Sequence, residues 1–293
     1  MFAGTYTALV TPFHKGRVDE GAFQKLISDQ VRGGVDGIVP VGTTGESPTL
    51  GFDEHIRVIE LAVRAAKGRV KVLAGTGANA TAEAVHLTQA AEAVGADGSL
   101  QVAPYYNKPS QEGVFQHFKK IARATRLPII LYSIPGRCNI AIEVPTVQRL
   151  AKACKNIVGI KEAGGDADRV SQLRSTLGQR FTILSGDDAL TLPFMAVGAE
   201  GVISVASNII PRQITRMVNA FTAGNADAAL RLHQKYYPMF KDLFIETNPV
   251  PTKAALAMLG KCTEEYRLPH CKMSAANRAQ LAKTLKACGV LKK

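Results

Sequence analysis

Asn-Ile-Val-Gly-Ile-Lys-Glu-Ala-Gly, residues 156–164, contains the strand from which the fold of this chain can be worked out. The apolar run Ile157–Ile160 has the length of a short strand; Lys161 ends it, and small residues follow. A lysine at the end of a buried strand loses hydration around its ammonium, which lowers its pKa and leaves a nucleophilic amine. A lysine in this place is more commonly just the first solvated residue, so the rest of the chain must decide.

Similar apolar runs recur along the chain, with amphipathic segments between them. We expect strands at Thr5–Val10, Gly37–Val41, Val70–Ala74, Gly98–Ala103, Ile129–Tyr132, Ile157–Ile160, Thr182–Leu184 and Gly201–Ser204. We expect helices at Glu20–Arg32, Asp53–Lys67, Thr81–Val94, Gln111–Thr125, Val144–Ala153, Ala167–Thr176, Ala189–Val197 and Pro211–Ala223. Mostly apolar runs are typical of parallel strands buried on both faces. Eight strands alternating with eight helices predict an α/β fold, a closed (β/α)8 TIM barrel.

The β pattern stops near Gly224. We therefore expect a catalytic barrel over residues 1–224 and a helical C-terminal extension over residues 225–293. Asp19 and Thr81 precede or open helical patterns and are expected to cap them.

The composition is that of an ordinary soluble protein, with 46% hydrophobic and 20% charged residues. The formal net charge is +12, but the basic residues are scattered and have no interleaved aromatic side chains, so nucleic acid is not expected as a partner. We see no membrane-spanning run and no secretory signal, and we expect a cytoplasmic protein. The five cysteines include no CxxC pair, which disfavours a disulfide framework or a zinc site.

In a barrel enzyme the active site lies at the C-terminal ends of the strands. Those ends contain a lysine, tyrosines, threonines and an arginine, but no histidine. The six histidines lack metal-binding spacing, and the pair Asp187-Asp188 is better explained as a helix N-cap, so we expect no metal. The same two aspartates would repel a phosphate in the loop after the seventh strand.

The remaining residues fit imine chemistry. Lys161 would attack a ketone to form a Schiff base. Tyr132, at the end of the preceding strand, could place its phenol near the same carbon as acid and base. Thr43 and Thr44 offer hydroxyl and backbone N–H groups that suit a carboxylate. Each residue taken alone could have only a structural role, but together at one end of the barrel they favour catalysis.

The chain resembles the dihydrodipicolinate synthases, within the N-acetylneuraminate lyase superfamily of class I aldolases. The resemblance rests on GTTGES at Gly42–Ser47, PYYNKP at Pro104–Pro109, YSIPGR at Tyr132–Arg137, GIKEA at Gly159–Ala163, and ETNP at Glu246–Pro249. It implies condensation of pyruvate with L-aspartate 4-semialdehyde to 4-hydroxy-tetrahydrodipicolinate, on the route to diaminopimelate and lysine. No cofactor is implied beyond a covalent imine of pyruvate on Lys161.

The resemblance also implies residue roles. The catalytic set would be Lys161, Tyr132, Thr43 and Tyr106, with Tyr106 reaching in from a neighbouring subunit of a homotetramer built as a dimer of dimers. The predicted substrate-binding set is Thr44, Ile203, Arg137 and Gly186, where Thr44 holds the pyruvate carboxylate and Arg137 the semialdehyde carboxylate. Ser133 and Cys138-Asn139 depart from the commonest family pattern without removing a catalytic group.

A lysine-inhibition site of the family is partly present. The matching residues are Ser47, His55, Asn79, Glu83 and Tyr105, whereas Phe52 stands where some lysine-sensitive members have histidine. L-Lysine is therefore a candidate inhibitor.

Two alternatives stay open. One is another pyruvate aldolase of the superfamily, acting on a sialic acid or a keto-sugar acid, which would need side chains that bind a polyol. The other is a non-catalytic keto-acid sensor, which would be expected to lose Lys161 or Tyr132; both residues are present.

Overall fold

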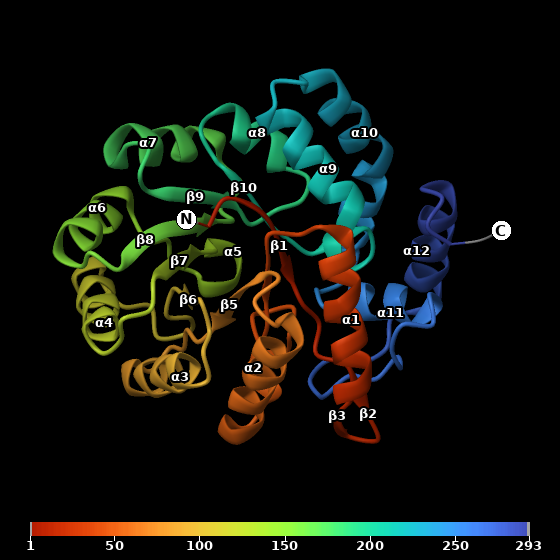
Figure 1. Cartoon of the computed structure of the whole chain (residues 1–293), viewed down its shortest axis with the longest axis horizontal. Coiled ribbons are helices and arrows are strands. Elements are labelled where there is room, and N and C mark those ends of the chain that lie inside the picture. Colours follow the sequence, from red (N-terminus) through yellow and green to blue (C-terminus); the bar gives the residue numbers. More distant parts are fainter. Residues whose placement is uncertain (1, 292–293) are drawn as a thin grey trace.

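Eight parallel strands form a closed barrel in the computed structural model, which describes residues 2–291 (Figure 1). The strands are β1 (Gly4–Ala8), β4 (Gly37–Val39), β5 (Lys71–Gly75), β6 (Gly98–Val102), β7 (Ile129–Ser133), β8 (Ile157–Glu162), β9 (Thr182–Ser185) and β10 (Gly201–Ser204). Each pairs with the next, and β1 closes the ring by pairing with both β4 and β10. The predicted TIM barrel is confirmed. Met1, Lys292 and Lys293, which the predicted domain ranges include, lie outside the described residues.

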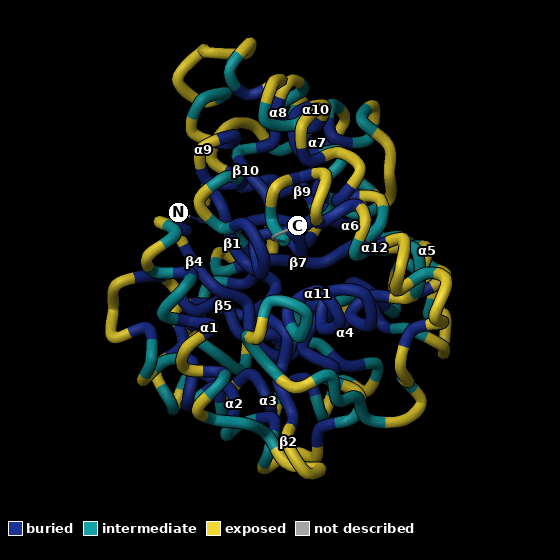
Figure 2. The backbone as a smooth tube through the Cα atoms, turned by 90° about the vertical axis from the view of Figure 1, so that its right-hand side faces the viewer, coloured by how far each residue is buried: buried dark blue, intermediate teal, exposed yellow. Residues whose placement is uncertain are grey.

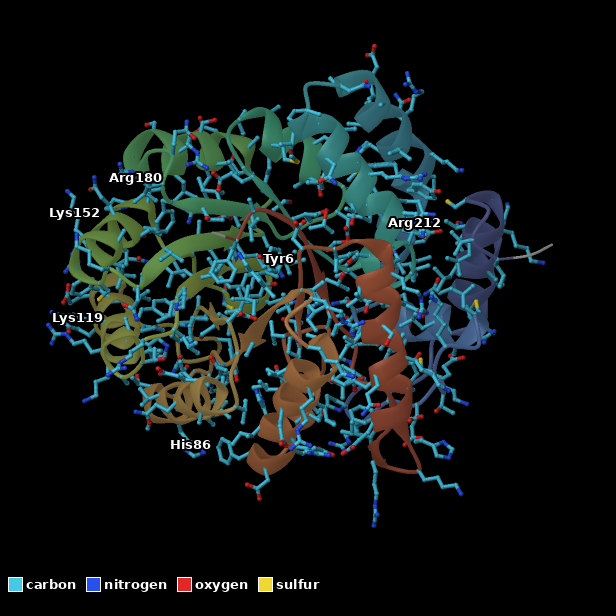
Figure 3. All side chains as sticks on the ribbon, viewed as in Figure 1. Tyr6, His86, Lys119, Lys152, Arg180 and Arg212 are labelled. Carbon is cyan, nitrogen blue, oxygen red and sulfur yellow. The ribbon has the colours of Figure 1, made fainter. Side chains whose placement is uncertain are left out.

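Helices surround the barrel and follow the strands in alternation (Figure 1). They are α1 (Glu20–Gly33), α2 (Phe52–Ala66), α3 (Thr81–Ala93), α4 (Gln111–Arg123), α6 (Val144–Ala153), α7 (Ala167–Leu177), α8 (Thr191–Ala196) and α9 (Pro211–Thr222). All eight predicted helices are therefore confirmed. Figure 3 shows Lys119 on α4 and Lys152 on α6 pointing away from the barrel, as expected for scattered basic residues on outer faces.

Several short elements were not expected from the sequence. β2 (Phe13–His14) and β3 (Arg17–Val18) form a small antiparallel hairpin after β1, and α5 (Pro135–Cys138) is a single helical turn after β7. Elements of two to four residues are too short to show a periodic pattern.

The capping prediction was right for one helix and wrong for another. Asp19 caps α1 by accepting the N–H of Ala22. Thr81 does not cap α3, because its hydroxyl forms a 2.9 Å hydrogen bond with Nδ1 of His117 on α4 instead.

The C-terminal helices α10 (Ala226–Asp242), α11 (Val250–Met258) and α12 (Ala275–Ala287) lie along one side of the barrel (Figure 1). Figure 2 shows α11 in the buried colour, whereas the exposed segments lie mainly at the periphery of the molecule. Its segment Val250–Leu256 is buried throughout. Within residues 2–291, no helix has the length and apolarity to cross a membrane.

Candidate active site

Lys161 and Tyr132 are direct neighbours at the C-terminal ends of β8 and β7, where they are paired in register. Side chains paired in this way point to the same face of a parallel sheet. Lys161 Nζ lies 4.1 Å from the centre of the Tyr132 ring, and both residues are about 95% buried, with exposures of 6% and 5%. The structure thus places these two predicted residues side by side.

Burial lowers the pKa of Lys161 to about 7, opposed by the negative charge of Asp188 and assisted by Arg137. A substantial fraction of the amine is then unprotonated at neutral pH, in contrast to an ordinary lysine with a pKa near 10.5. The Lys161 side chain can therefore act as a nucleophile without a separate base to deprotonate it.

The Tyr132 phenol forms a hydrogen bond with the Thr43 side chain. Burial raises the pKa of Tyr132, and the neighbouring Arg137 and the Thr43 hydrogen bond oppose that rise. The phenol is thus protonated at neutral pH, so it can donate its proton when a negative charge develops on a nearby oxygen.

Thr44, Asn248 and Arg137 form a connected group beside the lysine. Asn248 Nδ2 donates to Thr44 Oγ1 at 2.9 Å, and Arg137 Nη2 donates to the backbone oxygen of Asn248 at 3.2 Å. Sequence reasoning assigned no role to Asn248, although it was part of the ETNP motif. Its contact with Thr44 spans 204 positions, which no local pattern reveals.

A cavity of about 440 Å³, measured with its opening to solvent, joins these groups. Among its lining residues are Thr43, Thr44, Tyr132, Arg137, Lys161, Gly186 and Asn248. Six of these seven residues belong to the predicted site. A small molecule that has a carbonyl and a carboxylate would find an amine, a phenol, hydroxyls and a guanidinium in one concave space.

Gly186 follows β9, and its lack of a side chain leaves room for the Lys161 side chain. A Cβ at this position would lie 2.9 Å from Lys161 Cε and 2.6 Å from Ala163 Cβ. Any other residue here would therefore displace the lysine, which is the physical reason for glycine at this predicted site.

The N-cap explanation of Asp187-Asp188 was wrong, because neither side chain caps α8. Asp187 Oδ1 accepts the N–H of Ala189, a local turn contact, but α8 begins after Leu190 and has no side-chain cap. Asp188 is buried and accepts hydrogen bonds from Ser204 Oγ and from the N–H groups of Val205 and Ala206. Burial raises its pKa to about 6, against those hydrogen bonds. Asp188 thus holds the end of β10 in place.

Two predicted residues lie apart from the lysine in this chain. Ile203 is fully buried within β10, beside Tyr6 of β1. Tyr106 is 89% exposed in the loop after β6, with a positive φ of 72°. The structure of one chain does not bring Tyr106 to Tyr132.

A second cavity contains most of the residues that were predicted to bind lysine. Four residues of the predicted lysine site, Ser47, His55, Glu83 and Tyr105, line it together with Phe52. The fifth, Asn79, donates from Nδ2 to the backbone oxygen of Tyr105 at 3.2 Å. His55 Nε2 contacts the oxygen of Gly75 at 2.8 Å, and burial lowers its pKa. Ser47 and Tyr105 also line a third cavity, which shares Thr43, Tyr132 and Arg137 with the catalytic one and so lies between the two.

No group of three or more histidine, cysteine, aspartate or glutamate side chains between residues 2 and 291 is arranged to hold a metal ion.

Residues 1–288 match the model of the dihydrodipicolinate synthetase family. The chain belongs to the dihydrodipicolinate synthetase family. A 4-hydroxy-tetrahydrodipicolinate synthase of Endomicrobium trichonymphae is 53% identical over 292 residues, covering 100% of both chains.

Solved structures of the dihydrodipicolinate synthetase family agree with the fold. The 4-hydroxy-tetrahydrodipicolinate synthase of Methylacidiphilum fumariolicum SolV superposes with a TM-score of 0.98 at 55% identity, over 99% of this chain and 96% of that one. A synthase from Cyanidioschyzon merolae, solved with lysine bound, gives a TM-score of 0.96 at 42% identity over 99% of each chain.

Proposed function

We propose that this protein condenses pyruvate with L-aspartate 4-semialdehyde to form 4-hydroxy-tetrahydrodipicolinate. The observation that carries the proposal is a buried lysine amine with a pKa of about 7, placed 4.1 Å from the Tyr132 ring in a cavity that Thr44 and Arg137 also line. The membership of the family supports the same substrates.

The first half-reaction takes place on Lys161. Its neutral amine attacks the ketone carbon of pyruvate, and loss of water gives an imine, which is protonated to an iminium. The iminium withdraws electrons from the methyl carbon, so removal of one methyl proton gives an enamine. Thr44 binds the pyruvate carboxylate, while Gly186 leaves space for the lysine.

The second half-reaction joins the two substrates. The enamine carbon attacks the aldehyde, and the new alkoxide takes a proton from the Tyr132 phenol. The amine of the second substrate then attacks the iminium carbon and displaces Lys161 as the ring closes. Arg137 binds the semialdehyde carboxylate, a role suited to its planar pair of donors. Thr43, and Tyr106 of the partner subunit, complete the proton relay.

Borohydride trapping with pyruvate tests the first half-reaction. Peptide mass analysis should locate the reduced adduct on Lys161; an adduct on another lysine, or none, would refute the assignment. A comparison of aldehyde acceptors tests the second half. Preference for a sugar aldehyde over aspartate semialdehyde would instead support a sialic acid or keto-sugar acid lyase.

We also propose that L-lysine binds the second cavity and inhibits the enzyme. Glu83 can pair with an ammonium, and the third cavity, which Ser47 and Tyr105 also line, connects this cavity to the catalytic one. The lysine-bound relative supports this assignment. Initial rates with and without excess lysine test it: Glu83→Gln should weaken inhibition while turnover without lysine is retained, and unchanged activity of the parent enzyme in lysine would refute the proposal.

A homotetramer acting in the cytoplasm completes the proposal. The 89% exposed Tyr106 side chain is suited to burial against a partner subunit, where it would enter the relay. Sedimentation velocity measures the stoichiometry, and a fully active monomer would refute the role of Tyr106. Imaging of the tagged chain tests the location.

A further inference from the structure

The loop Val41–Glu46, which carries Thr43 and Thr44, has a strained backbone. Val41 has a φ of 50° and Glu46 a φ of 56°, in the left-handed region that a β-branched residue such as valine rarely adopts. The loop also folds tightly on itself, because a Cβ at Gly45 would lie 2.9 Å from Val41 N and Cα. Such a conformation persists only where the surrounding structure holds it.

The C-terminal extension supplies contacts that hold the loop. Asn248, just before α11, donates from Nδ2 to Thr44 Oγ1 at 2.9 Å. Lys253, within α11, donates from Nζ to Glu46 Oε1 at 2.6 Å. The contacts span 204 and 207 positions, so one short segment of the extension binds the middle and the end of the loop.

The Lys253–Glu46 pair is shielded from water. The two side chains are 0% exposed, and Lys253 Nζ lies 4.1 Å from the centre of the Phe13 ring and 5.4 Å from that of Tyr266. The second carboxylate oxygen, Glu46 Oε2, accepts the backbone N–H of Arg267 at 3.3 Å. Both oxygens are therefore held from the extension, and removal of either charge alone would leave the other one buried without its partner.

Asn248 also fixes which way the Thr44 hydroxyl points. Its Oδ1 accepts from Thr252 Oγ1 at 3.2 Å, which orients the amide so that Nδ2 faces Thr44. Because Thr44 Oγ1 accepts that hydrogen bond, its own hydrogen stays free to be donated to a substrate carboxylate. The backbone oxygen of Asn248 at the same time accepts from Arg137, the residue proposed to bind the other carboxylate.

We infer that Asn248 and the Lys253–Glu46 pair are positioning residues that hold Thr44 ready to bind the carboxylate of pyruvate. This role rests on the proposed function, because it assumes pyruvate as the first substrate. The C-terminal extension thus completes the carboxylate site of the barrel, although it supplies no group to the bond-making steps.

Asn248→Asp tests the hydroxyl orientation with almost no change in shape. The carboxylate has no N–H to donate, so Thr44 would turn its hydrogen toward Asp and offer pyruvate only lone pairs. We expect the KM for pyruvate to rise roughly tenfold to a hundredfold, the range for loss of a hydrogen bond to a charged group. Because Asn248 is 3% exposed, the new carboxylate should lower the melting temperature, and the KM is compared below that temperature, where the variant is folded. An unchanged KM for pyruvate in the folded variant would overturn the role of Asn248.

The double variant Glu46→Gln with Lys253→Met tests the buried pair. Each single change leaves a buried charge and should lower the melting temperature strongly, whereas the double change removes both charges and should restore much of it. If the pair positions the loop, the KM for pyruvate stays raised in the double variant. Recovery of both stability and KM would show that the pair is only structural, and would overturn its positioning role.

Lys261→Met is the matched control. Lys261 also joins the extension to the barrel through a carboxylate, with Nζ 2.8 Å from Asp29 Oδ2 on α1, but it does not contact the loop. The KM of Lys261→Met for pyruvate should equal that of the parent protein. If this KM rises as much as in the Asn248 and double variants, the inference is overturned, because the loss of any contact between the extension and the barrel would then be enough to raise it. Trapping of pyruvate by the parent protein separates the two proposals. If no adduct forms, the proposed function is refuted. If the adduct forms normally but the KM for pyruvate is unaltered in the Asn248 and double variants, only this inference is refuted.

Discussion

Two lysines are buried in the described part of the chain, and they lie in contrasting surroundings. Lys161 ends strand β8, and Lys253 lies within helix α11. Both amines lie 4.1 Å from the centre of an aromatic ring, and burial lowers the pKa of both. Only Lys253 forms an ion pair, with Glu46 at 2.6 Å; among residues 2–291, Lys161 has no carboxylate within salt-bridge distance.

The difference shows that burial alone does not make a lysine a nucleophile. The Glu46 carboxylate favours the ammonium form of Lys253 and occupies its hydrogen-bonding geometry, so that side chain connects two parts of the fold. Lys161 has Asp188 nearby, but that carboxylate is already hydrogen-bonded to the end of β10. Its amine therefore faces the cavity free to react.

Lys161→Met should have the largest effect on activity. We expect turnover to fall on the order of 10⁴-fold or more, because the covalent route is lost. Steady-state kinetics and the absence of a borohydride adduct check this. Residual turnover within tenfold of the parent enzyme would contradict the assignment.

The same change should not destabilise the fold. A folded pKa of about 7 against an unfolded value near 10.5 means that the unfolded chain binds more protons between these values, so this group lowers stability progressively as pH falls toward 7. Removing the amine relieves that cost. Chemical unfolding at pH 6 should therefore give a free energy of unfolding no lower than that of the parent protein.

Lys253→Met should show the opposite pattern. It leaves Glu46 buried without its partner, and we expect a loss of about 3–5 kcal/mol in the free energy of unfolding. Its pyruvate adduct should still form on Lys161, which mass analysis checks. An unchanged free energy of unfolding would contradict the claim that Lys253, unlike Lys161, stabilises the fold through its ion pair.

Tyr132→Phe tests whether the phenol hydroxyl beside Lys161, rather than the ring, is needed for catalysis. The ring stays and the phenol is lost, so turnover should fall ~10²–10⁴-fold while the fold is retained. Circular dichroism and kinetics measure the two properties. A nearly normal rate would remove Tyr132 from proton transfer.

Gly186→Ala tests the space around Lys161. The added Cβ would lie 2.9 Å from Lys161 Cε, and displacement of the amine should cost roughly 10- to 100-fold in kcat/KM. Lys253 is not among the residues that the added Cβ would meet, so its ion pair with Glu46 should be unaffected. An unchanged rate of adduct formation would show that the lysine accommodates the methyl group.

The sequence predicted the barrel well because its signal is local and repeated. Eight apolar runs alternate with eight amphipathic segments, and strand ends converge on one face of a barrel by topology alone, which brings Lys161, Tyr132 and Thr43 together. Short elements such as β2 and α5 have no period to detect.

The supporting contacts could not be predicted in the same way. Asp188 was expected to cap a helix but holds β10, and Asn248 reaches Thr44 across 204 positions. Both depend on where distant segments meet after folding. The roles assigned to Tyr106 and to the residues of the second cavity stay predictions.

The pH dependence of imine formation tests the central claim most directly, namely that burial without an ion pair makes Lys161 the nucleophile. The initial rate of cyanoborohydride trapping with pyruvate should be followed across pH, with the adduct located by mass. Because the neutral amine reacts and the pKa of Lys161 is about 7, the rate should reach half its maximum near pH 7 and level off above it. A rate that still rises tenfold per pH unit above about pH 9, as for an ordinary lysine, would contradict the account.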